Sequence, residues 1–189
     1  MDLTSEMADR LDRIEAQLAI QQLPIRYALA VDSRDFDAWT ELFVEDVNCG
    51  RHGSGRDVLR SIIEPACAGF YRSVHQICGH RIDLTGADTA SGMVYCRAEH
   101  EVGDAWIVMA ICYADSYERR QGQWYFTRRK ERHWYAADQT RRPAGPDFYD
   151  WPGRTLSEAT LPGLWPSWGE FWDGPGAARL AQVTRFPIA

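Results

Sequence analysis

The stretch GMVYCRAEHEVGDAWIVMAICYADSYERRQGQWYFTRRK, residues 92–130, decides the fold of this chain. Its hydrophobic pattern has the two-residue period of β-strands, whose successive side chains point to opposite faces of a sheet. The segments VGD and RQGQ interrupt it and have the length and composition of hairpin turns. Together with the residues that flank it, the stretch predicts an antiparallel meander of four long strands, at 73–85, 90–102, 105–119 and 123–137.

Helical patterns precede the strands. Apolar residues recur at intervals of three and four from Met7 to Leu18, so an amphipathic helix is expected to begin after Thr4 or Ser5 and to be interrupted at Pro24. Further helices are expected at 25–33, 36–43 and 56–71, and a short strand at 46–51. Helices followed by antiparallel strands predict an α+β fold, in which a curved sheet wraps around the N-terminal helices as a cone with an internal pocket.

The composition excludes several functional classes. A net charge of −6 argues against nucleic acid as a partner, because phosphate binding needs a basic face. The five cysteines form no CxxC or CxxH motif, so free thiols and no metal site are expected. The charged N-terminus is unlike a signal peptide, and no apolar run approaches the ~18 residues of a membrane span. We therefore expect a cytoplasmic protein with no membrane partner.

The last part of the chain has a different composition. Residues 138–189 hold seven of the nine prolines and four of the eight tryptophans. An aromatic segment of this kind is expected to pack on something. We expect a catalytic domain at 1–140 and an extension at 141–189 that packs on the pocket mouth or on a neighbouring subunit.

Strand parity sorts the five histidines. His100 is the polar group on an otherwise small and apolar strand face, which suits either a pocket residue or a hydrogen-bonded core histidine. His75 and His80 are five residues apart on one strand, so regular alternation would point them to opposite faces and keep them from sharing a metal. His52 and His133 are expected at the surface.

Asp32 follows an apolar helical run whose apolar side should face the core. A buried carboxylate needs a partner, and an imidazole would serve. A carboxylate bonded to one ring nitrogen fixes the tautomer and raises the basicity of the other nitrogen. The spacing of the residues leaves two interpretations open: Asp32 contacts His75, or Asp32 caps the next short helix.

Three motifs, in their order and spacing, resemble the SnoaL-like, or nuclear-transport-factor-2-like, superfamily over residues 5–140. The run AIQQLPIRYALAVDSRDFDAWTELFVEDV (19–47) is similar to the opening helices, in which a core aspartate precedes a D-x-x-x-W-x-x-L-F element. HQICGHRIDLTGADTASGMVY (75–95) resembles the first hairpin, where lyases of the family carry a catalytic histidine. SYERRQGQWYFTRRK (116–130) resembles the third and fourth strands. The resemblance implies an NTF2-like, or cystatin-like, α+β barrel.

Within the superfamily, the chain most resembles cofactor-free lyases: scytalone dehydratase, bile-acid 7α-dehydratase and hexachlorocyclohexane dehydrochlorinase. The resemblance implies a catalytic pair of Asp32 and His75, with His75 as general base. It also implies that Tyr27 and Arg129 stabilise charge on the leaving or carbonyl oxygen, and that His100 returns a proton. We further expect four residues to contact the substrate: Trp39, Phe43, Val94 and Trp106.

These features predict a lyase of the dehydratase type that needs no cofactor and acts on a small apolar substrate, aromatic or polycyclic. The resemblance also implies a homo-oligomer, a trimer. Three alternatives remain open. They are a deformylating carbon–carbon lyase acting on an aromatic diol, an isomerase or polyketide cyclase, and a non-catalytic small subunit of a ring-hydroxylating dioxygenase.

Overall fold

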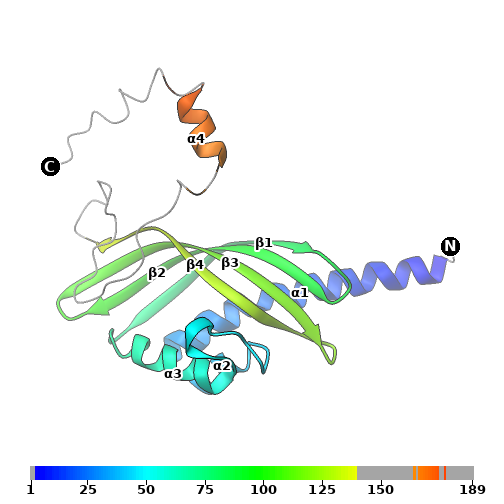
Figure 1. Cartoon of the computed structure of the whole chain (residues 1–189), viewed down its shortest axis with the longest axis horizontal. Helices are drawn as coiled ribbons and strands as arrows, with labels where there is room; N and C mark the ends of the chain where they lie inside the picture. Colours follow the sequence, from blue (N-terminus) through cyan, green and yellow to red (C-terminus); the bar gives the residue numbers. More distant parts are fainter. Residues whose placement is uncertain (1–2, 140–163, 165, 175–176, 178–189) are drawn as a thin grey trace.

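The computed structural model describes residues 3–139, 164, 166–174 and 177, and its elements are labelled in Figure 1. In chain order they are α1 (Leu3–Ser33), α2 (Phe36–Thr40), the 3₁₀ helix η1 (Gly50–His52), α3 (Arg56–Cys67), β1 (Ser73–Leu84), β2 (Thr89–Val102), β3 (Ala105–Arg120), β4 (Gln123–Asp138) and α4 (Pro166–Asp173). The expected extension at 141–189 lies mostly outside the described residues, so the proposed division of the chain stays a prediction.

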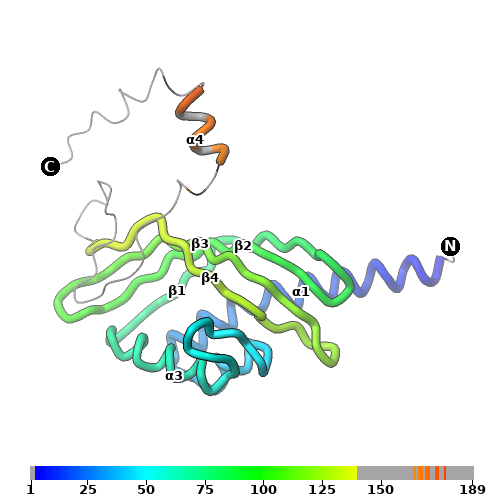
Figure 2. Tube along the Cα trace, viewed as in Figure 1, coloured from blue at the N-terminus to red at the C-terminus, as the bar shows by residue number. Residues whose placement is uncertain are grey.

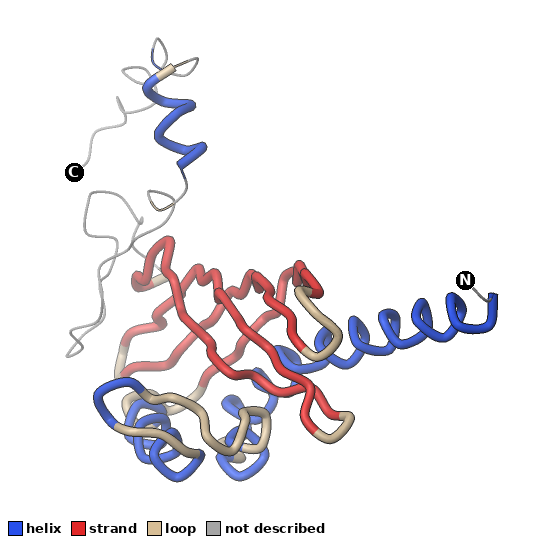
Figure 3. The backbone as a smooth tube through the Cα atoms, turned by 45° about the vertical axis from the view of Figure 1, so that its right-hand side comes forward, coloured by secondary structure: helices blue, strands red, loops and turns tan. Residues whose placement is uncertain are grey.

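The four strands form one antiparallel sheet in the order β1-β2-β3-β4. The chain passes up and down through them by hairpins, as the trace in Figure 2 shows. The sheet is curved, and α2, α3 and the C-terminal half of α1 lie on one side of it (Figure 3). This arrangement confirms the predicted α+β class, and the strand bounds agree closely with those expected from the two-residue period.

The core lies between these helices and the concave face of the sheet. Ile20 and Leu23 of α1 are almost fully buried, and so is Phe126 of β4. The Phe126 ring packs against Phe43 and Tyr117, with ring centroids 5.2 and 5.3 Å apart. Burial of this apolar surface is the main force that holds the helices on the sheet.

Two local predictions are wrong. α1 continues through Pro24, although a proline removes a backbone hydrogen bond from a helix interior. Pro24 is itself buried beside Ile20 and Leu23, and the packing of these residues offsets that loss. The expected strand at 46–51 is also absent. That segment makes an isolated bridge between Asn48 and Ser54 and then the 3₁₀ helix η1.

The N-terminal half of α1 extends beyond the sheet (Figure 1). Its apolar stripe is exposed there, from Leu3 and Met7 to Leu18. Arg119 of β3 reaches this part of the helix with an ion pair to Asp12, whose Nη1–Oδ1 distance is 2.6 Å. None of the described helices is both long and apolar enough to cross a bilayer.

A β-bulge corrects the prediction for the two histidines of β1. The pairing with β2 shifts at Cys78, between Ile77 and Gly79, so one extra residue enters the strand. His75 is therefore opposite Ala98 and His80 is opposite Val94, and both partners are buried on the concave face. His75 and His80 consequently point to the same side of the sheet, and not to opposite sides as regular alternation predicted.

The burial of Phe126 gives the first prediction. Phe126→Ala should lower the free energy of unfolding by about 3–5 kcal/mol, because it leaves a cavity among the rings of Tyr27, Phe43 and Tyr117. Urea denaturation followed by circular dichroism measures the change. Tyr71→Ala is the matched control, since Tyr71 is 82% exposed, and it should change the stability by less than about 0.5 kcal/mol. Equal effects of the two substitutions would contradict the assigned core.

The position of His80 gives a pH-dependent prediction. Burial, with the positive charge of Arg129, lowers the pKa of His80 from 6.5 to about 4. The unfolded chain therefore binds this proton at a higher pH than the folded chain, and the stability falls as the pH drops from 6.5 toward about 4. His80→Gln removes this titration. After allowance for the partial exposure of His80, the wild type should lose about 1–2 kcal/mol more than the variant across this range. Urea denaturation at a series of pH values measures this, and parallel profiles would contradict a buried, neutral His80.

Candidate active site

A cavity of about 210 Å³ lies between the helices and the concave face of the sheet. Residues of α1, α3 and all four strands line it. Its apolar side chains include Val31, Ile63, Phe70, Met109 and Ile111. Its polar side chains are Tyr27, His75, His100, Tyr113, Glu131 and His133. An apolar chamber with a few converging polar groups is typical of a ligand site, and this volume suits a small molecule.

Asp32 and His75 meet at one end of this cavity. The Oδ1 atom of Asp32 lies 2.7 Å from Nδ1 of His75, and the Oδ2 atom accepts the backbone N–H of His75 at 2.8 Å. The hydroxyl of Ser73 donates to the same carboxylate at 2.7 Å. The structure therefore brings together the two residues whose contact the spacing left open. Asp35, and not Asp32, caps the short helix α2.

The turn after α1 aims the carboxylate at β1. Arg34 has a positive φ of 63°, which few residues other than glycine adopt, and it ends the helix directly after Asp32 and Ser33. Its guanidinium donates to the carbonyl oxygens of Val31 and Phe70 and to the Ser73 hydroxyl. Arg34 thus ties the end of α1 to the residues that precede His75.

The environment of Asp32 fixes the tautomer of His75. Partial burial alone would raise the pKa of Asp32, but hydrogen bonds from His75 and Ser73 hold that pKa below its ordinary value. An ionised carboxylate can only accept, so Nδ1 of a neutral His75 ring carries the proton. The Nε2 atom is then the basic one. His75 lines the cavity, and its side chain is only 7% exposed.

His100 stands beside His75 in the cavity wall. The two imidazole rings are perpendicular, with centroids 5.4 Å apart. The ring of His100 also meets the edge of Phe70, with centroids 4.7 Å apart. His100 is therefore a buried polar group of the pocket, next to the predicted base.

Arg129 lies behind the cavity wall and does not line the pocket. Its guanidinium carbon is 3.9 Å from the ring centroid of Tyr113 and 4.3 Å from that of Tyr27. Its Nε atom is 3.3 Å from Oδ1 of Asp115, and both side chains are almost fully buried. Burial raises the pKa of Tyr27 and Tyr113, and the positive charge of Arg129 opposes part of that rise. Both tyrosines therefore offer neutral hydroxyl donors to the cavity.

Asp115 and Tyr117 connect Arg129 to His80, the histidine that the β-bulge in β1 turns to the concave face. The hydroxyl of Tyr117 donates to Oδ2 of Asp115 at 2.9 Å and lies 3.0 Å from Nε2 of His80. Burial raises the pKa of Asp115 to about 6, and the charge of Arg129 opposes this rise. This buried chain of polar groups keeps Arg129 in place beneath the tyrosines.

The sequence interpretation missed two residues of the site, Glu131 and His133. His133 was expected at the surface, yet its side chain is 5% exposed and lines the cavity. The pairing of β4 with β3 shifts at Thr127 and again at Trp134, and regular alternation between these points places Arg129, Glu131 and His133 on one face. Since Arg129 was already assigned to the inner face, strand parity could have found the other two.

None of the four residues expected to contact substrate lines the cavity. Trp39 and Phe43 are core residues whose rings pack against each other with centroids 4.9 Å apart. Val94 is fully buried opposite His80. The indole N–H of Trp106 donates to Glu99 at 2.7 Å, outside the cavity. Trp39 and Phe43 serve the packing of the core, and contact of the four residues with a substrate stays a prediction.

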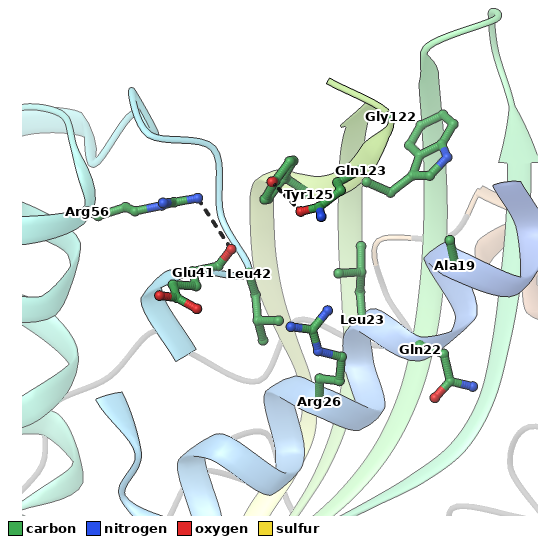
Figure 4. Close-up of a pocket in the computed structure, with 11 residues that line it drawn as sticks. Ala19, Gln22, Leu23, Arg26, Glu41, Leu42, Arg56, Gly122, Gln123 and Tyr125 are labelled. Atoms are coloured by element: carbon green, nitrogen blue, oxygen red, sulfur yellow. Dashed lines mark hydrogen bonds between the residues drawn. The ribbon is translucent and has the colours of Figure 1, made fainter. Parts of the chain in front are cut away.

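A larger pocket, of about 640 Å³, lies elsewhere, between α1 and the β3–β4 hairpin (Figure 4). Arg26, Glu41 and Arg56 bring charge to it, but Arg56 already donates to the carbonyl oxygens of Glu41 and Phe43. The described residues that line this pocket include no histidine and a single tyrosine, Tyr125. The smaller cavity is therefore the candidate active site.

The described residues include no group of three or more histidine, cysteine, aspartate or glutamate side chains placed to hold a metal ion. The cavity presents groups that can serve in acid–base chemistry: His75, His100, His133, Glu131 and the two tyrosines.

Comparison with known proteins agrees with this architecture. The family model described as a SnoaL-like domain matches residues 12–130. A gamma-hexachlorocyclohexane dehydrochlorinase from Sphingobium indicum is 27% identical over 129 residues, which cover 63% of this chain and 81% of that protein.

Solved structures share the fold. A hexachlorocyclohexane dehydrochlorinase from Novosphingobium barchaimii has a TM-score of 0.62 at 23% identity, over 68% of this chain and 93% of its own. A scytalone dehydratase candidate from Novosphingobium aromaticivorans has a TM-score of 0.61 at 23% identity, over 77% of this chain and 98% of its own. The helices, the four-stranded curved sheet and the matched segment together show that this chain belongs to the SnoaL-like family.

Proposed function

We propose that this protein is a cofactor-independent lyase in which His75 removes a proton from a small cyclic substrate. The observation that carries the proposal is the carboxylate of Asp32, 2.7 Å from Nδ1 of His75 at the edge of an apolar cavity. The dehydrochlorinase that is 27% identical catalyses an elimination by its name, and this supports the reaction class.

The reaction follows from the placement of the groups. The Nε2 atom of His75 takes a proton from a ring carbon, the electron pair of that C–H bond forms a new double bond, and the leaving group departs with its own pair. Asp32 keeps the imidazole oriented and stabilises the imidazolium that forms. The hydroxyls of Tyr27 and Tyr113 stabilise negative charge on a leaving group or on a carbonyl oxygen. His100 supplies a proton when the leaving group is a hydroxide.

Arg129 acts at a distance in this proposal. Because rings of Tyr27 and Tyr113 separate it from the cavity, its charge favours anionic character at the tyrosine hydroxyls without touching the substrate. It is a positioning residue for the two tyrosines.

The lining of the cavity supports the proposed substrate class. Aliphatic and aromatic side chains surround the polar groups, so the proposed substrate is a small, mainly apolar ring compound, aromatic or polycyclic. The same base acting on a hydroxyl would break the adjacent carbon–carbon bond, so that an aromatic diol releases an aldehyde and the ring carbon that keeps the electron pair takes up a proton. A proton returned to another carbon would give an isomerase. A homotrimer in the cytoplasm is part of the proposal, and light scattering tests the assembly.

The proposal is tested with two probes. Loss of HCl from gamma-hexachlorocyclohexane is followed by chloride release, and loss of water from 3-hydroxy-1-tetralone is followed by the absorbance of 1-naphthol. With whichever probe reacts, His75→Gln should lower kcat by about 10²–10⁴-fold, because the general base is lost. Asp32→Asn should lower it comparably, since the neutral amide no longer fixes the tautomer or stabilises the imidazolium.

His52→Gln is the control for this experiment, because His52 is exposed in η1 and does not line the cavity. It should retain wild-type activity. An unchanged kcat in His75→Gln would refute the proposed base. A folded wild type that releases neither product would support the non-catalytic subunit in place of the lyase.

The tyrosine hydroxyls give a separate prediction. Tyr27→Phe keeps the ring that packs against Trp39 and Arg129 but removes the donor. We expect kcat to fall by about 10–100-fold, which is the effect of one lost hydrogen bond of about 1.5–3 kcal/mol to developing charge. Tyr125→Phe, on a residue outside the cavity whose hydroxyl donates to Gln123, should leave kcat unchanged. Steady-state kinetics on the reactive probe distinguishes the two, and equal values for both variants would exclude Tyr27 from the chemistry.

A further inference from the structure

Glu131 and His133 form a second polar pair in the cavity, which the proposed elimination does not use. Both side chains belong to β4, and Nε2 of His133 lies 2.8 Å from Oε1 of Glu131. His133 is buried, with 5% of its side chain exposed, whereas 44% of the Glu131 side chain is exposed. Since both residues line the cavity, the exposed part of Glu131 faces its interior.

The second oxygen of this carboxylate is open to a ligand. Oε1 is engaged by His133, and within the described part of the chain Oε2 makes no hydrogen bond. The limited water inside the cavity would by itself raise the pKa of Glu131, but the hydrogen bond and charge of His133 hold that pKa below its ordinary value. An ionised carboxylate accepts hydrogen bonds and donates none, so the open oxygen selects a donor.

The sheet separates this pair from the dyad. His75 is on β1 and Glu131 is on β4, the two outer strands of the order β1-β2-β3-β4. Met109 of β3 lies in the same cross-strand row as His75, Ile111 lies opposite His133, and Tyr113 lies opposite Glu131, and all three line the cavity. A ring with one edge at His75 therefore lies across Met109 and Ile111 when its far edge points toward Glu131.

We propose that Glu131, held in place by His133, binds a hydroxyl group at the end of the substrate remote from the proton that His75 removes. The inference rests on the proposed function for the position of the reacting end. It predicts that hydroxylated ring compounds bind in preference to compounds whose polar atoms are all halogens, because a halogen offers Glu131 no hydrogen-bond donor. Burying the Glu131 carboxylate against such a compound would cost free energy, because no hydrogen bond would replace the water that the carboxylate loses.

Two probes of nearly the same shape test the inference by binding alone. 4-Ethylphenol carries the hydroxyl donor, and 1-ethyl-4-fluorobenzene carries a fluorine in its place. Ligand-observed NMR titration of the full chain gives both dissociation constants. Glu131→Met should weaken the binding of 4-ethylphenol by about tenfold or more, the effect of a lost hydrogen bond to a charged acceptor. The binding of 1-ethyl-4-fluorobenzene should stay within about twofold or become tighter.

Glu118→Met is the matched control, because Glu118 lies on β3, pairs with Arg120 and does not line the cavity. It should change neither dissociation constant. Equal weakening of both probes by Glu131→Met, an unchanged preference for the phenol, or no saturable binding of 4-ethylphenol to the wild type would each overturn the inference. Because no turnover is involved, such a result would leave His75 as the base untouched. An unchanged kcat in His75→Gln, in turn, would leave the recognition of the hydroxyl by Glu131 standing.

Discussion

The geometry of the site depends on the hydrogen bonds that the carboxylate of Asp32 accepts. This carboxylate accepts three hydrogen bonds, from Ser73 and from the backbone and ring of His75, and so binds the end of α1 to the start of β1. A half-buried carboxylate without these partners would destabilise the fold, so the helix and the strand must meet in this register. The same bonds set the ring plane and the tautomer of His75. One contact therefore satisfies a requirement of folding and orients the imidazole that we propose as the base.

The sequence predicted the sheet well because its evidence is local and repeated. Each strand alternates over a dozen residues or more, and hairpin turns separate them, so the order and bounds of β1 to β4 follow from the pattern alone. The sequence does not signal the bulges at Cys78, Thr127 and Trp134. A single extra residue turns the side chains that follow it to the other face of the sheet, but it does not change the composition of the strand. That is why His80 was assigned to the wrong face. Pro24 shows the opposite case, in which burial in the core overrides a local preference.

The site was predictable only in part, for reasons that concern distance along the chain. Asp32 and His75 are 43 residues apart, and no local pattern decides whether they touch; the family resemblance implied the contact that the structure displays. The resemblance also directed Arg129 to the substrate. In this chain buried Asp115 holds its guanidinium behind Tyr27 and Tyr113, an arrangement that depends on β3, β4 and α1 at once. Contacts that form only through tertiary packing cannot be predicted from the periodic pattern of the sequence.

The fixed charges around the cavity suit the charge separation of the proposed elimination. In that proposed reaction, positive charge would grow beside the carboxylate of Asp32 as the proton reaches His75, and negative charge would grow on the departing group. The tyrosines that would receive this negative charge stand over the buried cation Arg129, whose nitrogens make no hydrogen bond within the described residues. Asp115 is therefore the acidic group that lies close to the Arg129 charge among the described residues. The low dielectric of the interior screens this charge little. Donors, cation and carboxylate are already in position before the reaction begins, so the proposed transition state would need no reorganisation of the protein around it.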